Sequence, residues 1–276
     1  MKVIRYLIPY VFISSFNYYF AKEAIESASP IVFNLIRYLI SSAIFLSLTR
    51  KIIFNRDVFQ LAIYTTSSSI LWAFGLEYVT PSESAVLSYT MPLFSIPIAL
   101  IVLSEIPTKM EIIGLIIGFT GVILYGLPLV HGFTLFGAII TIINAIFWAA
   151  YTVFYRKLRN YNPLVVNASQ FTIGSGILLA LLPLSYEVNF NTQFVYGITY
   201  TSLAGGALAF FLWNMMIKVE KIPKVVVLSF SVPITTTVIE YILYHNSPFP
   251  IQLFGISLMF LGILISRVKS LSKQNF

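Results

Sequence analysis

The chain has 276 residues, of which 58% are hydrophobic and only 10% are charged, and its mean hydropathy is +0.88. A soluble domain carries about 25% charged residues, so this composition excludes an ordinary soluble domain, a disordered chain and a nucleic-acid-binding module. The chain has no cysteine and two histidines, so we expect neither a metal site nor a cofactor. The net charge of +7 has a different explanation, given below.

Ten stretches are apolar over roughly the 20 residues that a membrane-spanning helix needs. Backbone polar groups in lipid must be satisfied within the segment, so runs of this length are expected to be helices. We therefore expect an all-α integral membrane protein with ten transmembrane helices. The expected spans cover residues 4–21, 31–49, 58–79, 84–103, 112–130, 134–155, 163–183, 194–217, 225–243 and 251–266.

The first span is expected to remain in the chain rather than to act as a cleaved signal peptide. Pro30 directly follows the small residues 27–29 that could imitate a cleavage site.

Lysine and arginine predict the orientation. If the spans alternate, fifteen of the 17 bases lie in segments on one side, Lys22 lies on the other, and Arg37 lies within a span. Basic loops stay in the cytoplasm, so both termini are expected to be cytoplasmic. The positive charge thus reflects topology and needs no nucleic-acid partner.

The two halves of the chain match at one constant separation, which we call the repeat offset. Each half has five expected spans, and an odd number predicts that the halves are inverted relative to each other. The expected repeats are residues 1–130 and 131–276. Inverted repeats are typical of alternating-access transporters, with a site near the midplane between the halves. The pairs that define the repeat offset are Trp72 with Trp213, Pro92 with Pro233, Gly114 with Gly255, and Gly121 with Gly262.

A series of motifs along nearly the whole chain resembles the drug/metabolite transporter superfamily, specifically its EamA-like ten-helix permeases. The order and spacing of the motifs carry the resemblance. They are Lys22, Pro30, Arg37, residues 85–92, Ser104, Glu105, Pro107, Gly114 and Gly121 in the first half, and residues 147–151, Arg156, Lys157, Pro163, residues 209–213, Pro233, Gly255 and Gly262 in the second.

The resemblance implies a secondary-active or facilitative transporter of small organic solutes, amino acids or related metabolites, often exported across a plasma membrane. The expected partners are the solute and the lipid bilayer. Because both repeats lie in one chain, we expect a functional monomer. The chain departs from the family at Asn246, where a second glutamate equivalent to Glu105 is usual, and span one lacks the mid-membrane glutamate of the small multidrug relatives.

Polar and aromatic side chains gather on the spans that line the cavity in the resembling family. Indoles and amides in lipid need partners, so they face protein or water. Helix–helix packing and interfacial anchoring are the alternative roles. The candidates for a substrate cavity are Asn17, Tyr18, Trp72, Tyr89, Asn144, Trp148, Trp213, Asn214, Ser231, Thr235 and Glu240.

Four residues within spans have further expected roles. Glu240 is a candidate for proton coupling, or else a carboxylate that reaches the outer surface. Pro92 and Pro233 each remove a helix hydrogen bond and are hinge candidates. Arg37 could hold a substrate carboxylate, pair with an acid or reach the outer surface, whereas the resemblance favours a structural role for it.

Other function classes remain as alternatives. A channel would need a filter motif that the sequence lacks, and a lipid scramblase would need a polar groove facing lipid. An intramembrane enzyme would need grouped catalytic residues, whereas the acids other than Glu240 lie in or near loops. The sequence also lacks a P-loop for ATP, so we expect a transporter and not an enzyme.

Overall fold

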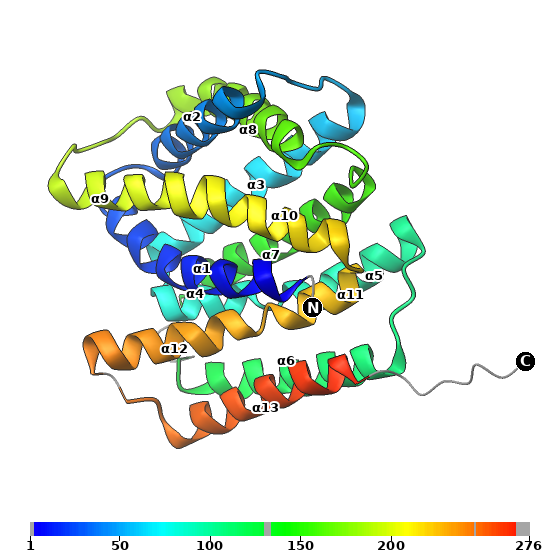
Figure 1. Ribbon diagram of the computed structural model, residues 1–276. Helices are drawn as coiled ribbons and strands as arrows, with labels where there is room; N and C mark the ends of the chain where they lie inside the picture. Colours follow the sequence, from blue (N-terminus) through cyan, green and yellow to red (C-terminus); the bar gives the residue numbers. More distant parts are fainter. Residues whose placement is uncertain (1–2, 130–133, 246, 269–276) are drawn as a thin grey trace, which may run out of the picture.

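The structure is a computed structural model that describes residues 3–129, 134–245 and 247–268. Within these ranges it has thirteen α-helices, one π-helical segment and no strand (Figure 1). The first half holds α1 (Ile4–Ile25), α2 (Pro30–Thr49), α3 (Arg56–Tyr78), α4 (Pro81–Ser88), α5 (Met91–Leu103) and α6 (Lys109–Gly126). The second half holds α7 (Leu135–Lys157), α8 (Pro163–Leu181), α9 (Thr192–Tyr200), the π-helical segment η3 (Thr201–Leu208), α10 (Ala209–Val219), α11 (Ile222–Leu228), α12 (Ser231–Tyr244) and α13 (Pro250–Arg267).

Eight segments of the described chain are long and apolar enough to cross a membrane. Several of them match the expected spans closely, such as α2 with 31–49 and α8 with 163–183. The expected spans 4–21 and 58–79 coincide with α1 and α3, which have 22 and 23 residues but are less apolar. The eight candidates are Pro30–Thr49, Pro81–Leu103, Lys109–Gly126, Leu135–Lys157, Pro163–Leu184, Thr192–Val219, Ile222–Ile239 and Pro250–Arg267.

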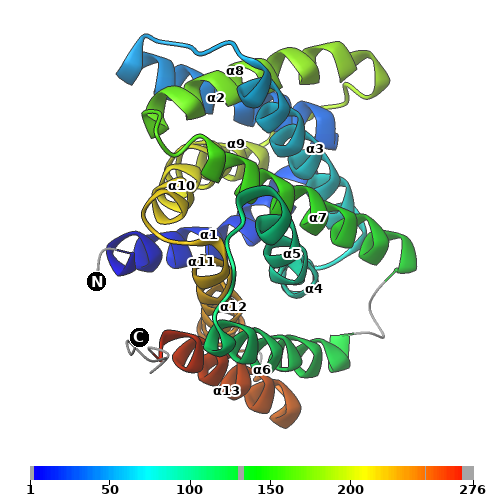
Figure 2. The ribbon, with the colours of Figure 1, turned by 90° about the vertical axis from the view of Figure 1, so that its right-hand side faces the viewer.

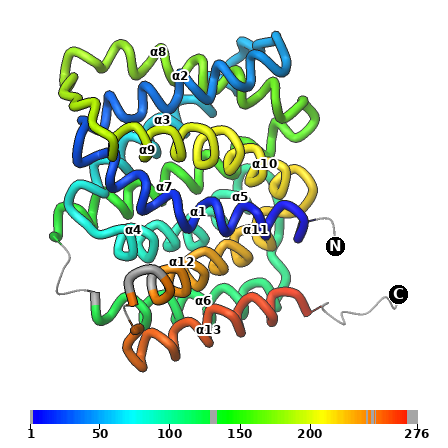
Figure 3. The backbone as a smooth tube through the Cα atoms, turned by 60° about the vertical axis from the view of Figure 1, so that its left-hand side comes forward, coloured from blue at the N-terminus to red at the C-terminus, as the bar shows by residue number. Residues whose placement is uncertain are grey.

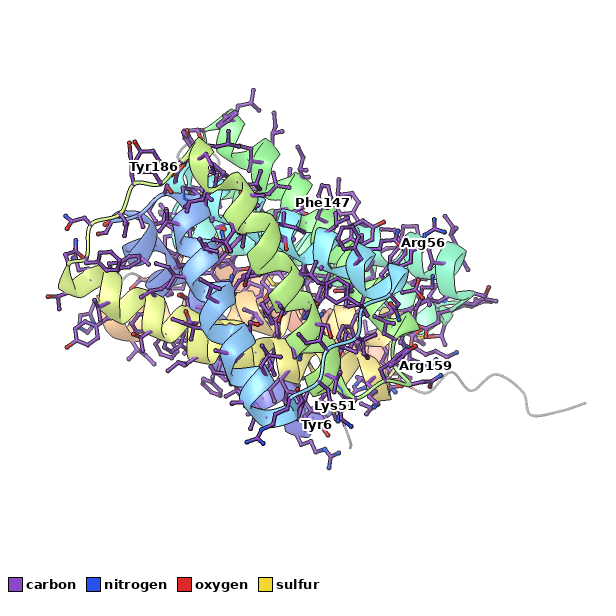
Figure 4. The ribbon with its side chains drawn as sticks, turned by 90° about the horizontal axis from the view of Figure 1, so that it is seen from above. Tyr6, Lys51, Arg56, Phe147, Arg159 and Tyr186 are labelled. Carbon is purple, nitrogen blue, oxygen red and sulfur yellow. The ribbon has the colours of Figure 1, made fainter. Side chains whose placement is uncertain are left out.

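The helices run side by side across the molecule, so the connections gather at two ends. The α10–α11 turn, the start of α1 and the end of α13 lie on the same side of the molecule, at the right of Figure 3. We call this the basic end, because Lys51, Arg56 and Arg159 lie toward it, whereas Tyr186 lies toward the opposite end (Figure 4).

The helices form a stack. Helices α2 and α8 pack together on one side, and α6 and α13 pack together on the other (Figure 2). The remaining helices lie between these two pairs, with α1 and α7 near the middle (Figure 3).

Helices α6 and α13 cross at glycines and run in opposite directions. A Cβ added at Gly121 would lie 2.5 Å from the carbonyl oxygen of Gly255, and one at Gly114 would lie 2.5 Å from that of Gly262. Small residues allow such close backbone approach in membranes, where packing rather than water exclusion drives helix association.

Two of the expected spans are interrupted. The regular α-helical hydrogen bonding is interrupted between α4 and α5 and again between α11 and α12, where the Thr90 and Phe230 amides bond carbonyls three residues back instead of four. Proline cannot bond the carbonyl four residues back and its ring clashes with that carbonyl. Pro92 therefore ends α4 at Ser88, and Pro233 ends α11 at Leu228.

Several hydrogen bonds occur twice, at positions related by the repeat offset. Some of them bond carbonyls at the ends of helices or amides just before helices, where regular helical bonding stops, and the others join a hydroxyl to the carbonyl one turn earlier in its own helix. At the breaks, Thr90 Oγ1 donates to Leu87 O (2.7 Å) and Ser231 Oγ donates to Leu228 O (2.6 Å). In a second pair, Ser95 Oγ donates to Met91 O and Thr236 Oγ1 donates to Val232 O. In a third pair, the Thr108 amide donates to the Glu111 side chain and the Phe249 amide donates to the Gln252 side chain.

We predict that Gly121→Ala destabilises the protein, because its methyl group would overlap Gly255 O and the Met259 amide nitrogen at 2.5 and 2.8 Å. Overpacking of this kind costs about 1–3 kcal/mol. Gly176 on α8 has nothing within 4 Å of an added Cβ, so Gly176→Ala is the matched control and should be neutral or stabilise by up to about 1 kcal/mol. Thermal unfolding in detergent measures both, and equal midpoints for the two variants would contradict this account of the crossing.

Candidate functional site

A cavity of about 110 Å³ lies halfway along α1, α3 and α7. Its wall also includes Arg37 of α2, the α4–α5 break, and Gly205, Ala209 and Phe210 of the η3–α10 segment. Both halves of the chain therefore contribute to it. An apolar cavity of roughly 150 Å³ accommodates benzene, so in this conformation the space suits a small solute and not a drug-sized one.

Six of the sequence-predicted residues line this cavity. They bring aromatic rings and amides together: Tyr18 contacts Trp72 edge-on with ring centroids 5.7 Å apart, and Asn144 Oδ1 accepts a 2.7 Å hydrogen bond from Ser68. Asn17 Oδ1 is buried with no hydrogen-bond partner among the described residues. The six are Asn17, Tyr18, Trp72, Tyr89, Asn144 and Trp148.

Trp213 and Asn214 lie behind the cavity wall. Both are fully buried. The Trp213 indole packs between Tyr10 and Trp148, with centroids 5.1 and 6.1 Å away, and donates to Thr152 Oγ1 at 3.2 Å. In this conformation they support the lining residues rather than join them.

The candidates on α12 lie elsewhere. Ser231 and Thr235 bond carbonyls of their own segment, Leu228 O and Ser231 O, and neither lines the cavity. Glu240 belongs to α12, but its side chain lies outside the described part of the structure. Of the two expected hinges, Pro92 adjoins the cavity through Tyr89 and Met91, whereas the break before Pro233 packs Phe230 against Gly118.

Further lining residues were absent from the sequence-based set. Tyr10 and Ser14 share a helix face with Asn17 and Tyr18, and Ser68 lies one turn before Trp72. Residues three and four apart are neighbours on a helix. Helical spacing from the predicted residues is therefore the signal that could have found them.

Arg37 is the one charged side chain among the lining residues. It is 3% exposed, and it donates from Nε to Thr201 O (3.0 Å) and from Nη2 to Gly205 O (3.4 Å). These carbonyls belong to η3, where π-helical geometry disturbs the regular bonding pattern. One turn further along α2, Ser41 donates to Ser202 O at 3.1 Å. Side chains on one face of α2 thus donate hydrogen bonds to three carbonyls of the π-helical segment η3, whose turns are wider than those of an α-helix.

Glycines bring α1 and α2 close to η3. A Cβ at Gly205 would overlap Asn17 Oδ1, and one at Gly206 would overlap Ser41 Oγ. The Gly205–Gly206 pair therefore does permit close packing, and the contact that it permits lies at the cavity.

A buried polar network separates the cavity from the basic end. Along α7 the cavity residues Asn144 and Trp148 come first and Tyr151 follows, one turn nearer the basic end. The network joins α3, α7, α8 and α10. Its bonds run from Tyr151 Oη to Asn214 Oδ1 (2.8 Å), from Asn214 Nδ2 and Gln170 Nε2 to Asn167 Oδ1 (2.7 and 2.8 Å), and from Thr65 Oγ1 to Gln170 Oε1 (3.2 Å).

A buried ion pair lies at the basic end itself. Arg156 Nε lies 2.8 Å from Glu105 Oε1, and Arg156 Nη1 donates to Ile217 O and Lys218 O at 2.6 and 2.9 Å. Glu105 Oε2 accepts from the Ile222 amide at 2.7 Å. One pair thus joins the ends of α5, α7 and α10 to the start of α11.

The opposite end has a related contact, which includes no ion pair among the described residues. Lys22 Nζ donates to Leu76 O (2.7 Å) and Glu77 O (3.3 Å). The repeat offset relates these two acceptors to Ile217 and Lys218, the acceptors of Arg156. Asn246, which the same offset relates to Glu105, lies outside the described residues.

Comparisons with known proteins agree with this membrane architecture. The model of the EamA-like transporter family matches residues 1–127 and 135–268. An uncharacterized transporter from Acidianus ambivalens is 46% identical over 244 residues, covering 88% of this chain and 96% of the relative. The uncharacterized transporter YvbV from Bacillus subtilis is 23% identical over 271 residues, covering 94% and 89%.

A solved crystal structure has the same fold, with a TM-score of 0.80 at 16% identity and 96% coverage of both chains. At that identity the likeness concerns the fold alone. The family model covers most of the chain and the relatives are transporters by name, as the sequence motifs predicted. The chain is a multi-pass membrane protein that belongs to the EamA-like transporter family.

Proposed function

We propose that this chain carries small organic solutes, amino acids or related metabolites, by alternating access between two inverted halves. The observation that carries the proposal is the cavity halfway along the helices. It is lined by α1, α2, α3 and the α4–α5 break from one half and by α7 and the η3–α10 segment from the other. A site at the midplane between two repeats is where such carriers bind their solutes.

The paired features support inverted five-span repeats at 1–130 and 131–276. The breaks at Pro92 and Pro233, the doubled hydrogen bonds and the antiparallel glycine crossing all relate positions separated by the repeat offset. In this proposal α4–α5 and α11–α12 each form one interrupted span, and α9, η3 and α10 form another. With α1 and α3 included, the spans number ten.

The basic end is then cytoplasmic and the membrane a plasma membrane, with the protein working as a monomer. The polar network and the Glu105–Arg156 pair lie between the cavity and the basic end. We assign the structure to a state that is closed toward the cytoplasm. Release of the ion pair would then allow the inward-open state.

A channel, a scramblase or an intramembrane enzyme would behave differently from a carrier. Only a carrier gives saturable, stereoselective counterflow, because its site faces one side at a time.

The direct test is counterflow of a labelled amino-acid panel in proteoliposomes, with and without a pH gradient. We expect saturable counterflow of at least one solute. Absence of counterflow for the whole panel, with protein shown to be folded, would refute amino acids as the substrate class. Non-saturable flux of solutes or of labelled lipid would favour a channel or a scramblase.

Glu240→Gln tests proton coupling, which rests on the sequence position of this acid within a span. If Glu240 carries the proton, the variant should lose its response to a pH gradient and keep exchange, because glutamine cannot titrate. Glu220→Gln is the control, since Glu220 pairs with Lys224 in a half-buried contact beyond the end of α10. A pH response that persists in Glu240→Gln would exclude this residue.

Glu105→Gln tests the closure of the basic end. Removing one partner of a buried pair costs about 3–5 kcal/mol, enough to shift a two-state equilibrium by about 100-fold or more. The chain has no cysteine, so a single Ser14→Cys reporter in the cavity would be the only thiol that a reagent can label. We expect a small membrane-impermeant thiol reagent added at the basic end to label this cysteine faster in Glu105→Gln.

Asp57→Asn is the matched control, because Asp57 lies 3.9 Å from Lys157 at the same end in an exposed pair. Exposed pairs contribute little, so its labelling should equal that of the parent. Equal labelling of the parent and Glu105→Gln would contradict a closing role for the ion pair.

A further inference from the structure

Arg37 brings a positive charge to the cavity that no described acid neutralises. The described residues form three ion pairs, and none of them includes Arg37. The main elements packed on α2 are α1, α3, α8, α9 and η3. Their acidic residues are Glu23, Asp57 and Glu77, each in the first or last turn of its helix, whereas Arg37 lies in the middle of α2.

The bonds from Arg37 to the π-helical segment use only some of the donors of its guanidinium. A guanidinium has five N–H donors, and the structure gives it two carbonyl acceptors. A neutral group can also donate a hydrogen bond to a carbonyl of η3, since the Ser41 hydroxyl does so on the next turn of α2. A permanent charge away from water is costly unless it is paired. The positive charge of Arg37 therefore needs an anionic partner, and the cavity is where such a partner could bind.

The surroundings of Arg37 fit a flat or apolar acid. Its guanidinium carbon lies 5.4 Å from the centroid of Trp72 and 5.7 Å from that of Phe210, with Trp148 edge-on to Phe210 at 5.2 Å. An arginine fork matches the two oxygens of a carboxylate. Aromatic walls suit the apolar remainder. The lining residues include no acid that could receive an ammonium group.

We propose that Arg37 binds the carboxylate of the solute and that the cavity prefers organic monoanions to zwitterions and neutral molecules. This inference deepens the proposed function, because it names the substrate class of the same cavity. Within the proposed class of amino acids or related metabolites it favours carboxylate metabolites over amino acids, since a zwitterion would leave its ammonium without a countercharge there.

Binding to the purified full-length protein tests the preference directly. The probes are propionate and benzoate, the neutral isosteres propionamide and benzamide, zwitterionic phenylalanine and inorganic phosphate. Binding is followed by calorimetry and by tryptophan fluorescence, since Trp72 adjoins Arg37. Charge-assisted hydrogen bonds should make at least one carboxylate bind about tenfold or more tighter than its amide. Amides or phenylalanine binding as tightly as the acids, or phosphate binding more tightly, would overturn the assignment.

Variants separate substrate binding from a purely structural role. Arg37→Gln should abolish the preference for acid over amide, and Arg37→Lys should keep part of it because the charge remains without the fork. Ser41→Ala, which loses a bond from the same face of α2 to η3, should keep the preference. Equal weakening of acid and amide in Arg37→Gln would assign Arg37 to structure alone. If Arg37→Gln does not fold, the acid-over-amide preferences of the parent protein and of Arg37→Lys still test whether Arg37 binds the carboxylate.

Failure of this inference is distinguishable from failure of the proposed function. Counterflow of neutral or zwitterionic solutes without any of carboxylates would leave the carrier standing and overturn the role of Arg37. A carboxylate preference in binding, without counterflow of any solute, would support the role of Arg37 and count against the carrier.

Discussion

The constraint on which this structure depends is that backbone polar groups inside a membrane need partners from the protein itself. Regular helices meet it internally. At several places where the described helices break, widen or end, a side chain donates to a backbone carbonyl. Hydroxyls do so at the two breaks, Arg37 and Ser41 at η3, and Lys22 and Arg156 at helix ends. The cavity lies beside the first break and the widened segment, where the chain is least regular.

Three cations illustrate how one kind of contact serves different purposes. Lys22, Arg37 and Arg156 all donate to carbonyls where helical bonding is interrupted. Arg156 also has Glu105 within 2.8 Å, which makes a closed, neutral contact suited to holding helix ends together. Arg37 has the carbonyls without an acid and faces a cavity. The presence or absence of one carboxylate therefore separates an ion pair that is complete within the protein from a cation that is left for the carboxylate of the proposed solute.

The sequence predicted the features that follow from composition and local chemistry. Apolar runs located α2, α8 and α13 to within about one or two residues, because helices in lipid need length and little else. Pro92 and Pro233 indicated interruptions, although these lie a little before the prolines, where proline clashes with the preceding turn. Asn17, Trp72 and Asn144 were expected at a cavity from their polarity and position, and they do line one.

Features that depend on tertiary contacts could not be predicted from composition and local chemistry. Nothing local marks residues 201–208 as π-helical, since the widened geometry relies on donors from α2 that lie far away in the sequence. Trp213 and Trp72 are related by the repeat offset, yet Trp213 is buried behind the cavity wall and Trp72 lines the cavity. The two halves are therefore packed differently around these indoles, although the sequence suggests a symmetric pair.

The central claim is that the two ends of the molecule open in turn. Distances between pairs of spin labels in a bilayer test it most directly, and the chain has no cysteine that would interfere with labelling. One pair would join Arg56 of α3 to Lys221 just after α10, and the other would join Tyr78 of α3 to Thr192 of α9. The account predicts that solute or the Glu105→Gln change lengthens the first distance while it shortens the second. Two distances that stay fixed, or that lengthen together, would contradict alternating access.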